Sequence, residues 1–242
     1  MAVDPSEQIA AFRTAFRAEG TAERAAGQQA YLKSELAFHG VTVPFIRKTA
    51  KAFRRERRDL GRDDLLTLTA GLWATSYHDL RSLAIALLEL YADLLLTADM
   101  AVMRDLLKRC HTWDHVDWLS IKVAGRLVER HAQAKRALPG WADDERFWLR
   151  RAALLALLDP LRAGRGDFGL FARLAAGMVE EKEFFIRKAI GWVLREVAKQ
   201  RPELTYAFLA EHIERVSGLT LREGAKYLPA AQQAALRECY RA

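Results

Sequence analysis

The sequence is poor in cysteine, glycine and proline, and it has no long apolar run. Its 242 residues include two cysteines, 14 glycines and six prolines. Cys110 and Cys239 lie far apart without CxxC spacing, which excludes a disulfide framework and favours a reducing, cytoplasmic location. The longest apolar runs, such as LLALL, are too short to cross a membrane, and MAVDPSEQIAAF has acids where a signal peptide has bases. We therefore expect a soluble protein that is not inserted in a membrane.

Several motifs of well-known chemistries are also missing. The chain contains no GxSxG, no GKS or GKT and no GxGxxG. Acyl transfer, nucleotide hydrolysis and dinucleotide chemistry are therefore disfavoured.

What the sequence does have is helix-forming residues and positive charge. Ala, Leu, Arg and Glu dominate, 51% of the residues are apolar, and the net charge is +7. The sequence pI of about 9.6 favours an anionic partner. Nucleic acid is the first candidate, and an anionic membrane surface is the alternative.

Apolar residues recur at helical spacing along the whole chain, whereas no stretch alternates convincingly for a strand. The pattern predicts one all-α domain over residues 1–242, with short breaks at Gly40, Gly61, Pro139-Gly140, Pro202 and Gly218 and a longer turn at 163–166. The expected helices span about 5–18, 22–37, 43–58, 62–73, 77–94, 99–109, 113–130, 144–158, 167–179, 182–200, 203–214, 219–228 and 230–240.

Four of these segments share an apolar residue followed by a charged one near the start of a helix. The charged residues are Arg81, Asp117, Arg150 and Arg187, separated by 36, 33 and 37 residues. This period is about one helix pair, so it predicts stacked helical hairpins that form a solenoid. Equivalent positions would then line one shared, concave and basic face.

Basic residues form stripes on two of the expected helices. One stripe contains Arg47, Lys51, Arg54, Arg55, Arg58 and Arg62, and the other contains Lys188, Arg195 and Lys199 with Trp192 among them. A solvated helix face explains either stripe. A surface that follows the phosphates of a nucleic acid is the functional alternative.

The stretch CHTWDHVDWL at 110–119 places two acids beside indole rings. With Thr112 as N-cap, Trp113 and Asp117 lie one turn apart on the same face, while Val116, Leu119, Val123 and Leu127 form the core stripe. Asp114 is explained as an acid in the first turn. Asp117 has two interpretations, a solvated surface acid and a functional carboxylate.

The same stretch offers possible metal ligands. His111 and His115 are four residues apart, and Cys110 is adjacent. No other segment supplies an obvious third and fourth ligand, so we expect no metal and treat the histidines as bystanders.

Three segments resemble the AlkD-like DNA glycosylases, which are DNA alkylation repair enzymes built from HEAT-like helical repeats. They are TWDHVD at 112–117, FWLRRAALLALL at 147–158 and KEFFIRKAIGWVLREVAK at 182–199. The resemblance extends in order from about residue 5 to 228. It implies an enzyme that excises purines alkylated at N3 or N7 from double-stranded DNA, as the first step of base excision repair, without a base pocket. One acid and two tryptophans suffice for this reaction, so we expect no cofactor, and a solenoid of this size is expected to be a monomer.

The resemblance also implies roles for particular residues. Asp117 would be the catalytic carboxylate, and Trp113 and Trp192 would form the walls of an aromatic cleft. Tyr31 would lie near the DNA. Contacts to the DNA backbone are implied for Arg151, Arg47 and Arg195, and the stripes add Lys51 and Lys188. Some family members differ at Thr112, Thr42 and Asp159, which bears on lesion range and DNA affinity.

The chemistry fits these residue types. A purine alkylated at N3 or N7 is cationic and leaves as a neutral base, while positive charge develops on the sugar. A carboxylate and electron-rich indole faces stabilise such a charge. Two alternatives stay open, a catalytically silent protein that binds DNA structure and a scaffold that binds other proteins.

Overall fold

The computed structural model describes residues 4–241, and it is helical from end to end. The only β pairing in this range is an isolated bridge between Ala37 and Tyr77. The all-α prediction is therefore confirmed. The contacts divide the chain into two compact units, residues 1–119 and 120–242.

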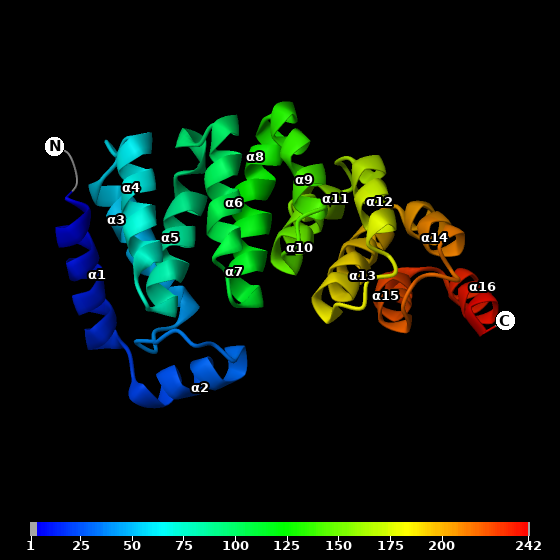
Figure 1. Ribbon diagram of the computed structural model, residues 1–242, viewed down its shortest axis with the longest axis horizontal. Helices are drawn as coiled ribbons and strands as arrows, with labels where there is room; N and C mark the ends of the chain where they lie inside the picture. The colour runs from blue at the N-terminus through cyan, green and yellow to red at the C-terminus, as the bar shows by residue number, and fades with distance from the viewer. Residues whose placement is uncertain (1–3, 242) are drawn as a thin grey trace. The chain divides into compact units, whose positions relative to one another are not determined.

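The helices of unit 1 pack mainly against their neighbours in the chain (Figure 1). Helix α5 contacts α3, α4 and α7, and α1 packs on α4. The side chains of Phe16, Leu65, Leu72, Trp73 and Leu83 fill the space between them. The elements are α1 (Pro5–Glu19), α2 (Ala22–Leu32), α3 (Val43–Glu56), α4 (Arg62–Ala74), α5 (His78–Leu90), α6 (Met100–Lys108) and α7 (Trp113–Trp118), with 3-10 turns η1 (Ala92–Leu94) and η2 (Thr97–Asp99).

Unit 2 is organised around α13, which contacts α10, α11, α14 and α15. The chain enters this unit through a π-helical segment, Leu119–Ala124, that continues α7 into α8. The elements are α8 (Gly125–Arg130), α9 (Leu138–Ala142), α10 (Phe147–Leu155), α11 (Leu158–Arg162), α12 (Phe168–Gly177), α13 (Phe184–Ala198), α14 (Pro202–Glu211), α15 (Gly218–Gly224) and α16 (Ala230–Arg241), with 3-10 turns η4 (Ala132–Ala137) and η5 (Ala225–Tyr227).

Most of the expected helices are found within a few residues of their predicted limits, but α11 was not expected and two other expectations were wrong. The helix expected over 22–37 ends at Leu32, because Lys33 adopts a left-handed conformation with φ of 50°. The break expected at Pro139-Gly140 is instead the start of α9, where a proline in the first turn costs no hydrogen bond. The turn at 163–166 is confirmed, and Gly164 and Gly166 have positive φ there.

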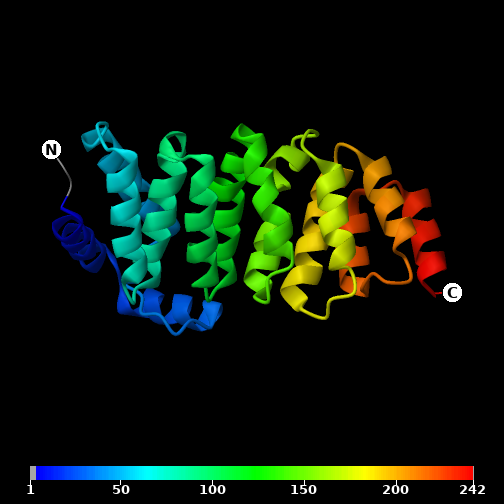
Figure 2. The ribbon, with the colours of Figure 1, turned by 45° about the horizontal axis from the view of Figure 1, so that its top comes forward.

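Helix α2 lies across the ends of its neighbours in unit 1 rather than alongside them (Figure 2). The segment after it returns to α5 through the bridge between Ala37 and Tyr77. Gly40 turns the chain with φ of +81°, at a point where a Cβ would collide with the Thr21 carbonyl. This turn packs the returning chain against the start of α2, the helix that carries Tyr31.

The repeated arginines are confirmed as equivalent positions, but with an unexpected role. Arg81 donates a hydrogen bond to the Thr75 carbonyl, and Arg150 and Arg187 likewise bond the carbonyl six residues upstream, at 3.0, 2.8 and 2.6 Å respectively. Each arginine therefore ties the start of its helix to the preceding loop. We call this contact the arginine brace, and it differs from the shared phosphate-binding face expected from the repeat.

Candidate active site

Helix α7 carries the predicted acid and the first tryptophan. Thr112 occupies the N-cap position, as predicted, and Val116 is fully buried. Trp113 and Asp117 are both half-buried, and their i and i+4 positions place them on one face of the helix. Val116, Leu119, Val123 and Leu127 are all in the core, so the predicted orientation of this segment is confirmed.

Asp117 corresponds to the arginines of the other repeats because it also follows a fully buried apolar residue. Counted from the first helical residue it is in fifth place, whereas the three arginines are in fourth place. A carboxylate has no proton to donate to a carbonyl, so Asp117 cannot form the arginine brace. This repeat therefore has an acid at the position where the other three have an arginine bonded to a loop carbonyl.

Tyr31 lies beside Trp113, although 82 residues separate them in sequence. The two ring centroids are 6.1 Å apart and the rings meet edge to face at 79°. Tyr31 is 73% exposed. The structure thus brings together two residues that sequence resemblance had placed near DNA.

A buried polar cluster holds the first turn of α7 against α5. His78 bonds Asp114 and Thr112, each at 3.3 Å, and His115 bonds Ser82 at 2.9 Å. Burial alone would raise the pKa of Asp114, but hydrogen bonds from His78 and Thr112 hold it well below its usual range. Burial lowers the pKa of His115 to about 3, so this ring is neutral at pH 7.

His78, Asp114 and His115 are also a possible group of metal ligands within the described residues. The two imidazole rings are stacked, with centroids 3.8 Å apart and planes 14° apart. The lone pair of an imidazole nitrogen lies in the ring plane, so two nearly parallel rings cannot direct their lone pairs at one ion. The geometry fits a hydrogen-bonded support for α7 better than a metal site. His111 is exposed and lies outside this group.

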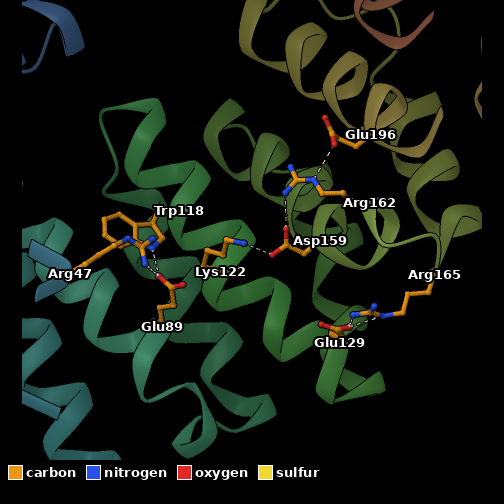
Figure 3. A network of polar contacts seen from close by, with 9 residues as sticks. All are labelled: Arg47, Glu89, Trp118, Lys122, Glu129, Asp159, Arg162, Arg165 and Glu196. Atoms are coloured by element: carbon orange, nitrogen blue, oxygen red, sulfur yellow. Dashed lines mark hydrogen bonds and ion pairs between the residues drawn. The ribbon is translucent and has the colours of Figure 1, made fainter. Parts of the chain in front are cut away.

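Arg47 of α3 joins a second cluster in unit 1 (Figure 3). Its guanidinium lies 3.1 Å from the Glu89 carboxylate and 4.5 Å from the centre of the Trp118 ring. Trp118 donates a 2.6 Å hydrogen bond to the same carboxylate. These contacts fix the orientation of an arginine whose side chain is still 42% exposed. Lys51 lies on the same helix and is exposed.

Trp192 is on α13 in unit 2, where it is half-buried. The preceding Gly191 allows α13 to approach α15 closely. A Cβ at Gly191 would lie 2.6 Å from the Cβ of Glu223 and 3.2 Å from the Thr220 carbonyl oxygen. The glycine in the segment KAIGW is therefore explained by helix packing.

Arg151 on α10 is only 3% exposed. Its guanidinium donates a 2.6 Å hydrogen bond to the backbone carbonyl of Phe185 and lies 5.7 Å from the centre of the Phe185 ring. In unit 2 this residue therefore links α10 to α13. Its contact with DNA stays a prediction from the motif.

Lys188 and Arg195 share one carboxylate, that of Glu223 on α15. Lys188 lies 2.6 Å from one of its oxygens and Arg195 lies 2.5 Å from the other. The hydrogen bond from Lys188 lowers the pKa of Glu223, so the acid is ionised at neutral pH. A DNA phosphate would have to compete with Glu223 for both side chains.

The positions at which family members differ have structural partners here. Thr42 is the N-cap of α3, and its hydroxyl accepts a bond from the amide of Phe45. Thr112 is 2% exposed and bonds His78. Asp159 forms ion pairs with Lys122 and Arg162 (Figure 3).

Glu89, Trp118 and His78 were not anticipated from the sequence. Each acts through a partner 29 to 42 residues away in sequence. Pairwise patterns within one helix cannot reveal such contacts. For Trp118, the only sequence feature that pointed to the site was its position directly after Asp117.

Comparison with known proteins identifies the family to which the chain is similar. A model of the family described as "DNA alkylation repair enzyme" matches residues 12–228. No curated protein matches the chain.

Similar solved structures support the fold. A predicted DNA alkylation repair enzyme from Enterococcus faecalis is 27% identical, covers 88% of this chain and 98% of its own, and has a TM-score of 0.75. AlkD2 from Streptococcus mutans is 16% identical, with coverages of 78% and 92% and a TM-score of 0.61. The smu.31 protein from Streptococcus mutans UA159 is 18% identical, with coverages of 77% and 98% and a TM-score of 0.57. Among the described residues, no helix combines the length and apolarity that a membrane span needs.

Proposed function

We propose that this chain, which belongs to the DNA alkylation repair enzyme family, is a monofunctional DNA glycosylase. Its membership of that family gives it a role in DNA repair. Its substrates would be cationic purines alkylated at N3 or N7 in duplex DNA. The observation that carries the proposal is Asp117, half-buried on one face of α7 with Trp113, whose ring meets that of Tyr31.

The proposed reaction is hydrolysis of the N-glycosidic bond. The bond between the sugar C1′ and the base nitrogen breaks, and its electron pair leaves with the base, which becomes neutral. Water forms the new bond to C1′ and releases one proton. Positive charge on the sugar is largest between these two events, and a fixed carboxylate stabilises it most at that point.

Asp117 would therefore act on the sugar and the attacking water rather than on the base. Trp113 and Trp192 would present electron-rich indole faces to the cationic sugar. A strong general acid is unnecessary because the leaving group is already cationic. The base need not be flipped into a pocket, so the protein would hold the DNA through its backbone.

The test is release of free base from duplex DNA that contains 7-methylguanine or 3-methyladenine. We expect release by the wild type and a loss of at least about 100-fold in the single-turnover rate of Asp117→Asn, because the stabilising charge is removed. Binding of undamaged DNA should be unchanged in this variant. Asp105→Asn, which removes an exposed carboxylate from α6, is the matched control.

The possible outcomes separate the alternatives. Release at only the spontaneous rate, with DNA binding intact, would identify a catalytically silent binder. Equal rates in wild type and Asp117→Asn would reject the role of Asp117 and leave the enzyme in place. A protein scaffold would bind no DNA.

A further inference from the structure

The start of helix α7, which carries Asp117, is fixed differently from the starts of the other repeats. Asp117 stands where the other three repeats have the arginine brace. The N-cap residue Thr112 forms no side-chain hydrogen bond to the backbone of the first turn, all of which the structure describes. The Thr21 and Thr42 side chains, by contrast, cap α2 and α3 in this way. Helix α7 has only six residues, so its own backbone bonds hold it weakly.

His78 supplies an attachment for this helix from outside. It is the first residue of α5, and it is 4% exposed. Its Nε2 atom lies 3.3 Å from the Thr112 hydroxyl and 3.3 Å from one oxygen of Asp114, so a single ring nitrogen reaches both the N-cap and the first turn. The low pKa of Asp114 keeps this carboxyl ionised. A carboxylate only accepts, so Nε2 donates, and a hydrogen bond to a charged acceptor is stronger than a neutral one.

Two rings hold the imidazole of His78 in one orientation. Phe38 stacks on it with centroids 4.5 Å apart and planes 17° apart, and His115 stacks on it at 3.8 Å and 14°. Two rings cannot stack on the same face, so the imidazole lies between them. The arginine brace of Arg81 fixes the start of α5 three residues further on. The ring is therefore held with Nε2 directed at α7.

The same histidine is attached to the chain segment that follows Tyr31. The backbone amide of His78 donates a 2.9 Å hydrogen bond to the Ala37 carbonyl, next to the Phe38 that stacks on the ring. This segment leaves α2, whose Tyr31 ring meets Trp113 edge to face. His78 thus contacts α7, which carries Trp113, and also the segment that continues from the helix of Tyr31.

We propose that His78 is a positioning residue for the reaction at Asp117. Through Asp114 it holds the first turn of α7, and so it keeps the carboxylate of Asp117 and the indole of Trp113 in fixed places. The inference rests on the proposed function, because it gives this contact an effect on base release. A carboxylate stabilises charge on the sugar best when it need not reorient during the reaction. A misplacement of about 1 Å can cost about 100-fold in rate.

The test separates the hydrogen bond of His78 from its ring stacking. His78→Phe keeps a ring between Phe38 and His115 but loses the donor. His78→Gln keeps a donor near the position of Nε2 but loses the ring. The control, Ser82→Ala, removes a buried hydrogen bond between the same two helices, the one to His115, and leaves the bond to Asp114 in place. Single-turnover base release at saturating enzyme and affinity for undamaged duplex DNA are measured well below the unfolding temperature of every variant.

We expect base release in His78→Phe to be about 10- to 100-fold slower, with DNA affinity within about twofold of the wild type. His78→Gln should recover most of the rate although it is less stable, and Ser82→Ala should match the wild type. A full rate in folded His78→Phe, or an equal loss in Ser82→Ala, would overturn the proposal. A rate in His78→Gln as low as in His78→Phe would also overturn it, because the stacking and not the donor would then decide the rate.

A double-mutant cycle tests whether His78 acts through the carboxylate of Asp114. If it does, the loss of rate in the double variant His78→Phe with Asp114→Ala should be no larger than the larger of the two single losses. Losses that multiply would show that the two residues act separately, and they would contradict the proposal.

Backbone hydrogen exchange distinguishes failure of this proposal from failure of the glycosylase reaction. The amides of residues 116–118 should exchange faster in His78→Phe than in His78→Gln, because the first turn of α7 opens more often without the donor. If even the wild type releases no base but exchange differs in this way, the reaction fails and His78 still holds α7. If base is released and His78→Phe changes neither the rate nor the exchange, the positioning role fails alone.

Discussion

At the scale of single residues, histidines of the same segment meet opposite environments. His115 is fully buried against His78 and Ser82, whereas His111 is exposed four residues earlier. The pKa of the buried imidazole falls because protonation would place a charge in the core. The titration of His115 should therefore affect the stability of the protein.

We expect the stability of the protein to decrease as the pH falls from 6.5 to 4.5. Unfolded His115 takes up a proton near pH 6.5, but the folded residue resists protonation down to about pH 3. Acid therefore favours the unfolded state, by about 1.4 kcal/mol per pH unit for one such group. The measurement is urea unfolding at several pH values.

The comparison requires two variants. His115→Gln should lose most of this pH dependence, and His111→Gln should retain it. An unchanged slope in His115→Gln would show that other groups cause the acid sensitivity.

Contacts between residues far apart in sequence were anticipated only where the family resemblance gives a role to both residues. The resemblance places Tyr31 near the DNA and Trp113 in an aromatic cleft, and the structure brings their rings together edge to face. Glu223 was not anticipated as the partner of Lys188, because 35 residues separate them. A charge pattern within a helix reports its exposed face, but not the acid that another helix brings to it.

At the scale of elements, the crossing of α13 and α15 depends on one missing side chain. Gly191 lies where a Cβ would press on the backbone of Thr220 and on the Cβ of Glu223. We expect Gly191→Ala to destabilise the protein by about 1–3 kcal/mol, because both helices must move apart. Chemical denaturation measures the change.

Gly27 provides the matched control. It is also inside a helix, α2, but an added Cβ would meet nothing within 4 Å. Gly27→Ala should therefore stabilise the protein by about 0.5–1 kcal/mol. Effects of the same sign at both sites would contradict the explanation by close packing.

Element limits were predictable where apolar periodicity decides them and unpredictable where distant contacts do. The 3.6-residue pattern located α3, α4 and α13 closely. It overextended α2, because that helix ends at the left-handed Lys33 and the chain then turns back to the bridge between Ala37 and Tyr77. The arginine brace was also missed, since its acceptor is a backbone carbonyl and every residue has one.

At the scale of the whole molecule, the boundary between the two units falls inside a helical stretch. Residues 113–130 are helical without interruption, through the π segment 119–124, and the boundary lies between 119 and 120. A linker between independent domains is usually an exposed, irregular segment. We therefore expect residues 1–242 to unfold as one domain.

Differential scanning calorimetry tests this expectation. A single transition should have an enthalpy of about 170 kcal/mol near 60 °C, and the van't Hoff value should equal it. A van't Hoff enthalpy near half the calorimetric one would indicate two halves that unfold separately.

The arginine brace also bears on how such a chain can be rebuilt. Donor and acceptor lie six residues apart in each of the three cases. A helix pair that is copied together with its preceding loop therefore contains both partners of this hydrogen bond. Duplication or exchange of such a pair would keep this contact, while the ion pair between Arg150 and Glu181 would need both partners. The repeat with Asp117 is the exception, because the start of α7 is held by hydrogen bonds to His78 on α5, in the preceding repeat. In a modular redesign, α5 and α7 would therefore have to be transplanted together.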